Sequence, residues 1–302
     1  MSYHPLYNHD LFQEICQYLS LQELIKLEQL SKFHKNTIRN HPWNHIMVKL
    51  TTESLDVLKL YNFLKWDLSG TKITDRQVVK LKNCHTLNLY NCQYISDKSV
   101  RELNKCHTLN LCYTQITDES IKELKNCHTL ELVGTRITDA SLSYLKNCHT
   151  LNLHLCRKIT DKSIKELKNC HTLNLSYTNI TDASLVHLKN CHTLDLEWCT
   201  KITDVGVKEL GNCHTLNLSR TFITDASVIY LKKCHTLNLS KTNITDESIK
   251  ELGNCHTLNL ACTTITDVGA IHLKKCHKIS LNYFDKVSSE CITELRECVD
   301  LI

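Results

Sequence analysis

The sequence is poor in glycine and proline, with six Gly and two Pro among 302 residues. This scarcity argues against a disordered Pro/Gly-rich polymer and against a loop-rich secreted scaffold. No apolar run approaches the ~18 residues of a membrane span, and the first residues, MSYHPLYNHD, lack the basic and then apolar pattern of a signal peptide. We therefore expect no membrane partner and no export.

The positive charges are not gathered in a block. The formal charge of +4 comes from Lys and Arg interleaved with Glu, as in the segment KELKN at residues 165–169, so a nucleic-acid partner is not expected. The chain also lacks a nucleophile–base set, a Gly-rich phosphate loop and a carboxylate pair that stands apart from its repeats. We expect a binding protein that is not an enzyme and needs no cofactor.

Eighteen cysteines could suggest disulfides and secretion. Secretion, however, would expose Asn174, Asn217 and Asn238 as Asn-Leu-Ser glycosylation sites inside expected strands. A reducing compartment, the cytoplasm or the nucleus, fits the composition better.

Ten Cys-His pairs recur at intervals of 21 or 22 residues, which is the period of a solenoid. Their cysteines are Cys84, Cys106, Cys127, Cys148, Cys170, Cys191, Cys213, Cys234, Cys255 and Cys276. An incomplete first copy places Phe63 in the cysteine slot, with Trp66 and Leu68 as its strand residues. The last copy runs from Cys276 to about Glu297, so eleven repeats result.

Each copy carries the pattern of a short strand followed by a short helix. In the copy that begins at Cys170, residues 172–175 alternate polar and apolar, which is typical of a strand with one buried face. Thr181-Asp182 offers side-chain oxygens to cap a helix, and apolar residues recur at every third position from Leu185 to Cys191. One such unit is too small to fold alone. We therefore predict an α/β solenoid, with a parallel strand ladder on its concave side and helices outside.

The Cys-His pairs are poorly placed to share a metal ion, because adjacent residues in an extended chain project to opposite sides. Zinc sites usually draw converging ligands from CxxC knuckles, and the sequence contains none. We predict buried cysteines, surface histidines and no metal site. Two other possibilities follow from stacking. Equivalent cysteines come within disulfide range on oxidation, and equivalent histidines form a ladder whose charging near pH 6 destabilises the fold.

The pattern Cys170-x-x-Leu173-x-Leu175-x-x-Thr178-x-Ile180 resembles the leucine-rich repeat, with Cys in the first apolar slot. Three longer copies carry a second cysteine after the strand: Cys92, Cys156 and Cys199. These copies resemble the cysteine-containing leucine-rich repeats found in many F-box proteins.

Residues 1–50 lack this period and carry helical patterns instead. We predict helices over Asp10–Leu19, from a capping box at Ser20-Leu-Gln-Glu23 onward, and from Ser31 toward Arg39. One interpretation is a helical cap on the end of the solenoid. The segment DLFQEICQYLSLQELIKLEQLSKFHKNTIRNHPWNHI is, however, also similar to the F-box.

F-boxes dock on the Skp adaptor of cullin-type ubiquitin ligases through apolar side chains. By position, the resemblance assigns adaptor binding to Leu11, Ile15, Cys16, Leu19 and Leu24. The alternative for several of them is that they hold the three helices together. It implies an F-box-like helical domain over 1–50, a helical connector over 51–62, and a leucine-rich-repeat solenoid with a C-terminal cap over 63–302. The near-identity of the copies also resembles F-box/leucine-rich-repeat proteins of giant DNA viruses of amoebae, which would imply the host cytoplasm.

Recognition by such arrays usually takes place on the concave strand face. An Asn between the two strand leucines recurs in most copies, and we expect its amides to bond to one another across strands. Variation concentrates in acidic strand residues and in the two slots after the second Leu. The candidate substrate-binding residues are Glu131, His154, Tyr177, Asp195, Glu197, Trp198 and Arg220. Exposed aromatics of this kind either anchor protein interfaces or pack on their neighbours along the ladder.

These resemblances together predict the substrate receptor of a Skp–cullin–F-box ubiquitin ligase. Its partners would be a Skp-type adaptor, a cullin reached through that adaptor, and a protein substrate that the sequence does not name. A first alternative is a ubiquitin-independent binding module whose N-terminal helices only cap the solenoid. A second is a metal or redox sensor that uses the Cys-His pairs.

Overall fold

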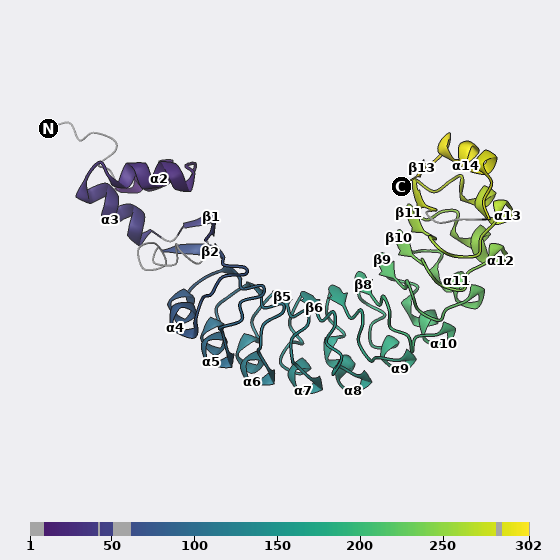
Figure 1. Ribbon diagram of the computed structural model, residues 1–302, viewed down its shortest axis with the longest axis horizontal. Coiled ribbons are helices and arrows are strands. Elements are labelled where there is room, and N and C mark those ends of the chain that lie inside the picture. The colour runs from purple at the N-terminus through teal and green to yellow at the C-terminus, as the bar shows by residue number, and fades with distance from the viewer. Residues whose placement is uncertain (1–8, 42, 51–61, 282–285, 302) are drawn as a thin grey trace. The chain divides into compact units, whose positions relative to one another are not determined.

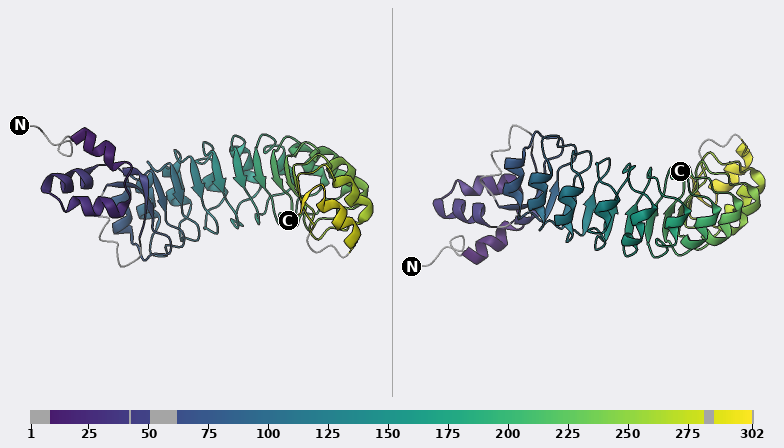
Figure 2. Two further views of the ribbon diagram at one scale, coloured as in Figure 1. Left: turned by 90° about the horizontal axis from the view of Figure 1, so that it is seen from above. Right: turned by 90° about the horizontal axis from the view of Figure 1, so that it is seen from below.

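The computed structural model describes residues 9–41, 43–50, 62–281 and 286–301. They form two compact units, Met1–Leu130 and Glu131–Ile302. Within each unit, consecutive strands pair in parallel and the helical segments of the repeats lie on the other side of the coil, as Figures 1 and 2 show. The predicted α/β solenoid with a parallel strand ladder is confirmed.

The first unit begins with three helices and continues with the first repeats. Its elements are α1 (His9–Cys16), α2 (Leu21–Glu28), α3 (Lys32–Asn40), β1 (Trp43–Lys49), β2 (Phe63–Asp67), α4 (Asp75–Val78), η3 (Val79–Leu81), β3 (Thr86–Asn88), α5 (Asp97–Val100), η4 (Arg101–Leu103), β4 (Thr108–Asn110), α6 (Asp118–Ile121) and η5 (Lys122–Leu124). The next strand, β5 (Thr129–Glu131), ends at the first residue of the second unit.

The second unit continues the same repeat. Its elements are α7 (Asp139–Leu142), β6 (Thr150–Asn152), α8 (Asp161–Ile164), η6 (Lys165–Leu167), β7 (Thr172–Asn174), α9 (Asp182–Leu185), β8 (Thr193–Asp195), α10 (Asp204–Val207), η7 (Lys208–Leu210), β9 (Thr215–Asn217), α11 (Asp225–Leu231), β10 (Thr236–Asn238), α12 (Asp246–Ile249), η8 (Lys250–Leu252), β11 (Thr257–Asn259), α13 (Asp267–Ala270), η9 (Ile271–Leu273), β12 (Lys278–Ser280), α14 (Ser289–Arg296) and β13 (Asp300–Leu301).

Equivalent leucines stack in register along each unit. Leu173 of β7 pairs with Leu151 of β6 on one side and with Leu194 of β8 on the other. Every apolar position predicted for one copy is at most 1 % exposed: Cys170, Leu173, Leu175, Ile180, Leu185 and Leu188. The incomplete first copy is confirmed too, because Phe63, Trp66 and Leu68 are buried. Burial of this row in every coil is the main source of stability.

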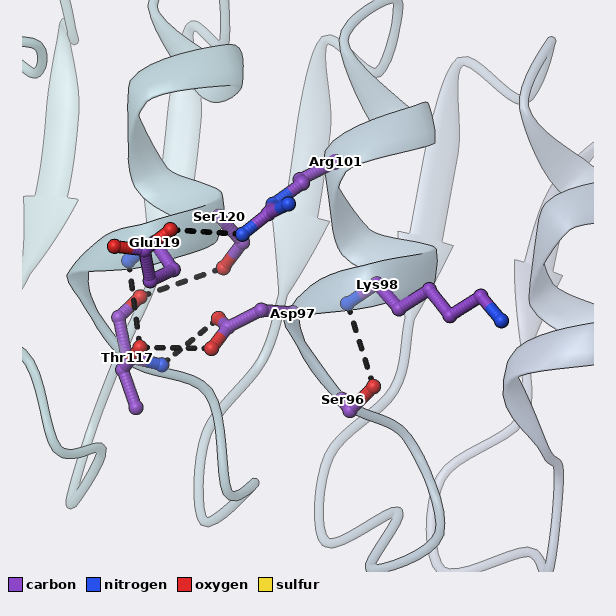
Figure 3. A network of polar contacts seen from close by, with 7 residues as sticks. All are labelled: Ser96, Asp97, Lys98, Arg101, Thr117, Glu119 and Ser120. Atoms are coloured by element: carbon purple, nitrogen blue, oxygen red, sulfur yellow. Dashed lines mark hydrogen bonds and ion pairs between the residues drawn. The ribbon is translucent and has the colours of Figure 1, made fainter.

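A carboxylate joins each helix start to the next. Thr117 caps its own helix, with its Oγ1 accepting a hydrogen bond from the backbone N–H of Glu119 at 3.3 Å. Asp97, from the preceding repeat, accepts hydrogen bonds from the Thr117 N–H at 2.9 Å and from its hydroxyl at 2.7 Å, as Figure 3 shows. The predicted cap is therefore confirmed for Thr. Its neighbour Asp instead bonds across to the following repeat, where it satisfies N–H groups that the helix start leaves free.

The N-terminal residues form the three predicted helices, and Ser20 and Glu23 make the predicted capping box. The third helix runs close to its predicted bounds, but not all of the predicted helical domain over 1–50 is helical. The helix ends at Asn40, and residues 43–49 form β1, which pairs in parallel with β2. Trp43 and Val48 are buried in this strand. The Trp43 indole N–H donates to the Ile38 carbonyl of α3 at 2.7 Å, and Val48 pairs with Trp66 of β2, so β1 joins the last helix to the first coil. The predicted helical connector falls largely on residues 51–61, which lie outside the described residues.

Candidate protein-binding site

The second slot after the second strand leucine has a backbone conformation of its own. Tyr177, Trp198 and Arg220 occupy this slot with φ near +58°, in the left-handed region that side chains rarely adopt. Backbone hydrogen bonds hold the conformation: the Tyr177 N–H donates to the Glu197 carbonyl at 2.9 Å, and the Trp198 N–H donates to the Ser219 carbonyl at 3.0 Å. The coils therefore stay in register beyond the strands, and side chains in this slot lie one above another.

Three side chains of this slot, together with His154 from the first slot of the preceding copy, form a continuous row of ring contacts. We call it the aromatic column: His154, Tyr177, Trp198 and Arg220. The rings of His154 and Tyr177 meet edge to face with centroids 5.1 Å apart, and those of Tyr177 and Trp198 lie parallel at 5.3 Å. The guanidinium carbon of Arg220 lies 4.3 Å from the centre of the Trp198 ring. Trp198 nevertheless keeps 39 % of its surface exposed. The aromatics therefore pack on one another along the ladder, as one of the two interpretations predicts, and Trp198 still presents part of its ring to solvent.

Two acidic side chains lie beside the column. Glu197 Oε1 is 3.7 Å from the Nε of Arg220, so the pair fixes the guanidinium above the indole. Asp195 of β8 accepts a hydrogen bond from the Glu197 N–H at 2.9 Å and one from the Asn174 amide at 3.4 Å. Burial raises the pKa of the Asp195 carboxyl, because desolvation disfavours its charged form.

The Asn that recurs between the two strand leucines makes different hydrogen bonds from those predicted. Each Asn oxygen accepts a hydrogen bond from the backbone N–H two residues later, for example Asn174 from Ser176 at 2.9 Å and Asn217 from Ser219 at 3.0 Å. The amide oxygen thus supports the turn into the left-handed slot instead of bonding to the Asn of the next strand. Asp195 keeps this acceptor while adding a charge.

The structure separates Glu131 from the other six predicted residues. It lies half-buried at the end of β5, three strands before Asp195. The sequence analysis also missed Ser176, whose hydroxyl lies 2.5 Å from Nδ1 of His154 and fixes that ring. The signal was present, because Ser176 occupies the first of the two variable slots. In the first unit Tyr90 and Tyr113 make a similar edge-to-face pair at 5.5 Å.

The predicted adaptor-binding residues are divided between interior and surface. Cys16 and Leu24 are fully buried inside the N-terminal unit, as expected of residues that hold the helices together. Leu19 is half-buried, whereas Ile15 is 39 % exposed, and the side chain of Leu11 lies outside the described residues. Tyr18, which the sequence analysis did not select, lies in the turn after α1 and is 86 % exposed.

The Cys-His pairs divide as predicted, with buried cysteines and exposed histidines. Burial raises the pKa of the Cys170 thiol to about 12, and its Sγ donates to the Cys148 carbonyl at 3.2 Å. The histidine rings stack, as for His171 and His192, whose centroids are 4.6 Å apart. Parallel rings do not converge on one point. Within the described ranges, no group of three or more His, Cys, Asp or Glu side chains could hold a metal ion.

Three segments, residues 190–211, 235–253 and 256–274, match the family model described as Leucine Rich repeat. These three segments, all in the second unit, are similar to leucine-rich repeats. A comparison with curated proteins finds no matching sequence. In the part of the chain that the structure describes, no helix has the length and apolar character needed to cross a bilayer.

Solved structures share this architecture at low sequence identity. An internalin (inlF) from Listeria monocytogenes is 16 % identical over 93 % of each chain, with a TM-score of 0.63. A chain of the Rad7–Elc1 complex in yeast is also 16 % identical, covers 99 % of this chain and 92 % of its own, and gives a TM-score of 0.64. The functional domain of InlJ from Listeria monocytogenes, which includes a cysteine ladder, is 16 % identical over 77 % of this chain and 63 % of its own, with a TM-score of 0.54. These likenesses show the fold alone.

Proposed function

We propose that this chain is the substrate receptor of a Skp–cullin–F-box type ubiquitin ligase. In this function the aromatic column holds a protein substrate, and the N-terminal helices bind a Skp-type adaptor. The observation that carries the binding part is the column itself, four stacked side chains with Trp198 still exposed between Tyr177 and Arg220. Aromatic and Arg side chains of this kind contribute most of the free energy at protein interfaces.

The adaptor part of the proposal is supported by the N-terminal helices. Their sequence is similar to the F-box, and α1, α2 and α3 form where that resemblance requires them. Ile15 and Tyr18 remain exposed beside the buried Cys16, so an apolar surface is available for a partner helix. The yeast Rad7–Elc1 structure is a complex of two proteins whose matching chain has a similar architecture over 99 % of this chain.

Co-purification with a Skp-type adaptor tests the adaptor part. The full chain should capture the adaptor, and Ile15→Asp with Tyr18→Asp should abolish capture, because two charges would then be buried in an apolar contact. A matched control replaces two exposed aromatics of the repeats, Tyr94→Asp with Phe222→Asp, and should leave capture unchanged. Failure of the intact chain to capture any Skp-type adaptor would remove the ligase function.

One structural observation favours the ubiquitin-independent alternative. Residues 43–49 form strand β1, which extends the sheet beyond β2 and buries Trp43, as the terminal cap of a solenoid does. A chain that captures a protein through the aromatic column but ignores every adaptor would fit this alternative. The two functions therefore predict different results for adaptor capture but the same result for capture of a protein by the aromatic column.

A further inference from the structure

The helix side of the second unit alternates between two kinds of repeat. The segments η6, η7 and η8 carry Lys-Glu-Leu, and each belongs to every second repeat. In the repeats after them, the same place holds an apolar residue followed by a polar or aromatic one: Val186-His187, Ile229-Tyr230 and Ile271-His272. This two-repeat period is absent from the strand residues, where Thr-Leu-Asn recurs in nearly every copy.

Three open hollows lie at the Lys-Glu-Leu segments η6, η7 and η8. The hollow at η6 has a volume of about 560 Å³ and is lined by Lys146, Lys165, Glu166, Lys168, Asn169 and His187. The hollow at η7 has a volume of about 290 Å³, and the one at η8 of about 330 Å³. A Cβ atom at Gly211, which lines the η7 hollow, would lie 2.6 Å from the Tyr230 carbonyl oxygen, so the backbones of neighbouring repeats approach closely there.

Lysine dominates the walls of these hollows. The η7 hollow has four lysines, Lys189, Lys208, Lys232 and Lys233, against a single glutamate, Glu209. The η6 hollow has three lysines against one glutamate. The lining of the η8 hollow has three lysines and no acid, although one of them, Lys274, is paired with Glu294 outside it at 3.0 Å. The lysines are exposed, so each hollow presents a net positive charge to solvent.

Apolar side chains lie between these charges. Ile229 and Tyr230 line the η7 hollow and are 43 % and 47 % exposed, and Ile271 lines the η8 hollow. Exposed aliphatic side chains next to lysines fit a ligand that carries both acidic and apolar groups. The chain itself shows no segment over them among the residues described.

We propose that this row of hollows binds an extended acidic segment of a partner protein, with carboxylates facing the lysines and apolar residues facing Ile229 and Ile271. Successive hollows are two repeats apart, at least about 10 Å, which three or more residues of an extended chain span at ~3.3 Å each. The linings contain no Arg, and their rings are Tyr230, His187 and His272, one in each hollow. Without Arg they lack the planar group that best recognises phosphate, and a single ring per hollow gives bases no continuous surface to stack on. A flat bilayer would not enter hollows.

This surface is separate from the aromatic column. The lysines lie at the helix segments, whereas the column follows the strands, so the two lie on different sides of the same coils (Figure 1). The inference therefore goes beyond the proposed ligase function and does not depend on it. One coil can hold a partner on its strand side and an acidic segment on its helix side.

The test uses a fluorescein-labelled twelve-residue peptide with the sequence Glu-Glu-Leu repeated four times, titrated with the full chain by fluorescence anisotropy. We expect Lys208→Glu with Lys232→Glu to weaken binding by about tenfold or more, because attraction becomes repulsion. The matched control, Lys158→Glu with Lys162→Glu, makes the same change of charge at exposed lysines outside the hollows and should change affinity by less than about twofold. Ile229→Ser should weaken binding by about threefold.

Three outcomes would overturn the proposal. The first is no binding of the peptide by the intact chain at about 1 mM in low salt. The second is equal loss in both lysine pairs, which would show a general charge effect. The third is tighter binding of a twelve-residue oligodeoxythymidylate, or of vesicles containing phosphatidylserine, than of the peptide. Circular dichroism checks that each variant is folded, and Trp198→Ala should leave peptide binding unchanged.

Discussion

The helix starts and the aromatic column both recur once per repeat, but they differ in how much they vary. At the helix starts a Thr or Ser cap followed by Asp is present in nearly every copy, and the Asp carboxylate bonds to the next cap in line. In the column the same slot holds Tyr177, Trp198, Arg220 and then Lys241. A residue that must satisfy a neighbour on each side is held constant, whereas one that faces solvent is free to differ.

This comparison has an energetic basis. The Asp161 carboxylate is bound by the Thr181 N–H and hydroxyl and by the Ser184 hydroxyl, so its loss would leave several donors without an acceptor. Removal of the Trp198 side chain would cost only its stacking contacts, because the coil beneath it stays packed on Leu194 and Leu196. Folding therefore constrains the first set of positions, and recognition is available to the second.

The largest expected effect comes from the stacked leucines that underlie both regions. Leu194→Ala removes a side chain that is 1 % exposed and packed between its equivalents in β7 and β9. We expect the free energy of unfolding to fall by about 2–5 kcal/mol, as for other buried Leu→Ala changes. Urea unfolding followed by circular dichroism measures it. The control Val205→Ala, at an exposed position, should change stability by less than about 0.5 kcal/mol.

The second effect compares two helix-start aspartates whose hydrogen bonds differ by one serine hydroxyl, Asp161 and Asp182. Asp161→Ala should lower the free energy of unfolding by about 2–3 kcal/mol, because three hydrogen bonds to a charged acceptor are lost. Asp182→Ala should cost less, since Gly206 replaces the serine that would bond to Asp182. Equal losses in the two variants would contradict this account of the contact.

The same carboxylate also makes stability depend on acid. Burial works to raise the pKa of Asp161, but hydrogen bonds from Ser184 and Thr181 outweigh it and hold the pKa below the ordinary value. A group whose folded-state pKa is lowered stabilises the fold above its unfolded pKa, near 4, and loses that contribution as pH falls through the folded value. The stability gap between the native chain and Asp161→Ala should therefore narrow in that range, as urea unfolding at several pH values would show.

The third effect falls on binding rather than on folding. Trp198→Ala should weaken substrate capture by about tenfold or more, the size expected for a central aromatic anchor, while the free energy of unfolding falls by less than about 1.5 kcal/mol. Quantitative mass spectrometry of proteins retained by the immobilised chain measures capture, and urea unfolding measures stability. A variant that binds normally but is strongly destabilised would show that Trp198 serves stability, as the helix-start residues do, and not binding.

Most of the fold could be predicted from the sequence because the signal is repeated. Ten Cys-His pairs and the alternating Leu173 and Leu175 fix the period, the strand and its buried face, and one copy explains the others. The strand β1 could not be predicted, because residues 43–49 pair with the first coil without sharing its pattern. The hydrogen bonds from the next repeat to Asp97 could not be predicted from the sequence either, because an Asp can equally cap its own helix or accept bonds from a neighbouring repeat.

The candidate site was predictable as a set of variable slots, but not as a stack. The left-handed backbone at Trp198 is not coded by glycine, and it is this backbone that aligns Tyr177 and Arg220 on either side of the indole. Glu131 shares the acidic character of Asp195 but lies three strands before it. Two acidic residues at the same position of different repeats therefore need not lie close together.

The smallest expected effect concerns the histidine ladder, whose members recur like the helix starts but face solvent like the column. The pKa of His171 is lowered by desolvation and by its neighbours His149 and His192, and His214 and His256 are lowered in the same way. Because the folded pKa lies below the unfolded value near 6.5, the unfolded chain binds more protons as pH falls through that region, and stability decreases.

The melting temperature should accordingly be lower at pH 5.5 than at pH 7.5 in low salt. Replacing His171, His214 and His256 by Asn removes alternate members of the like-charged row, so the triple variant should lose less of its melting temperature over the same interval. High salt should shrink the difference in the native chain, because the rings are exposed and their repulsion is screened. An equal drop in both proteins would show that acid acts through the carboxylates of the helix starts instead, which would move the pH sensitivity to the other region of the comparison.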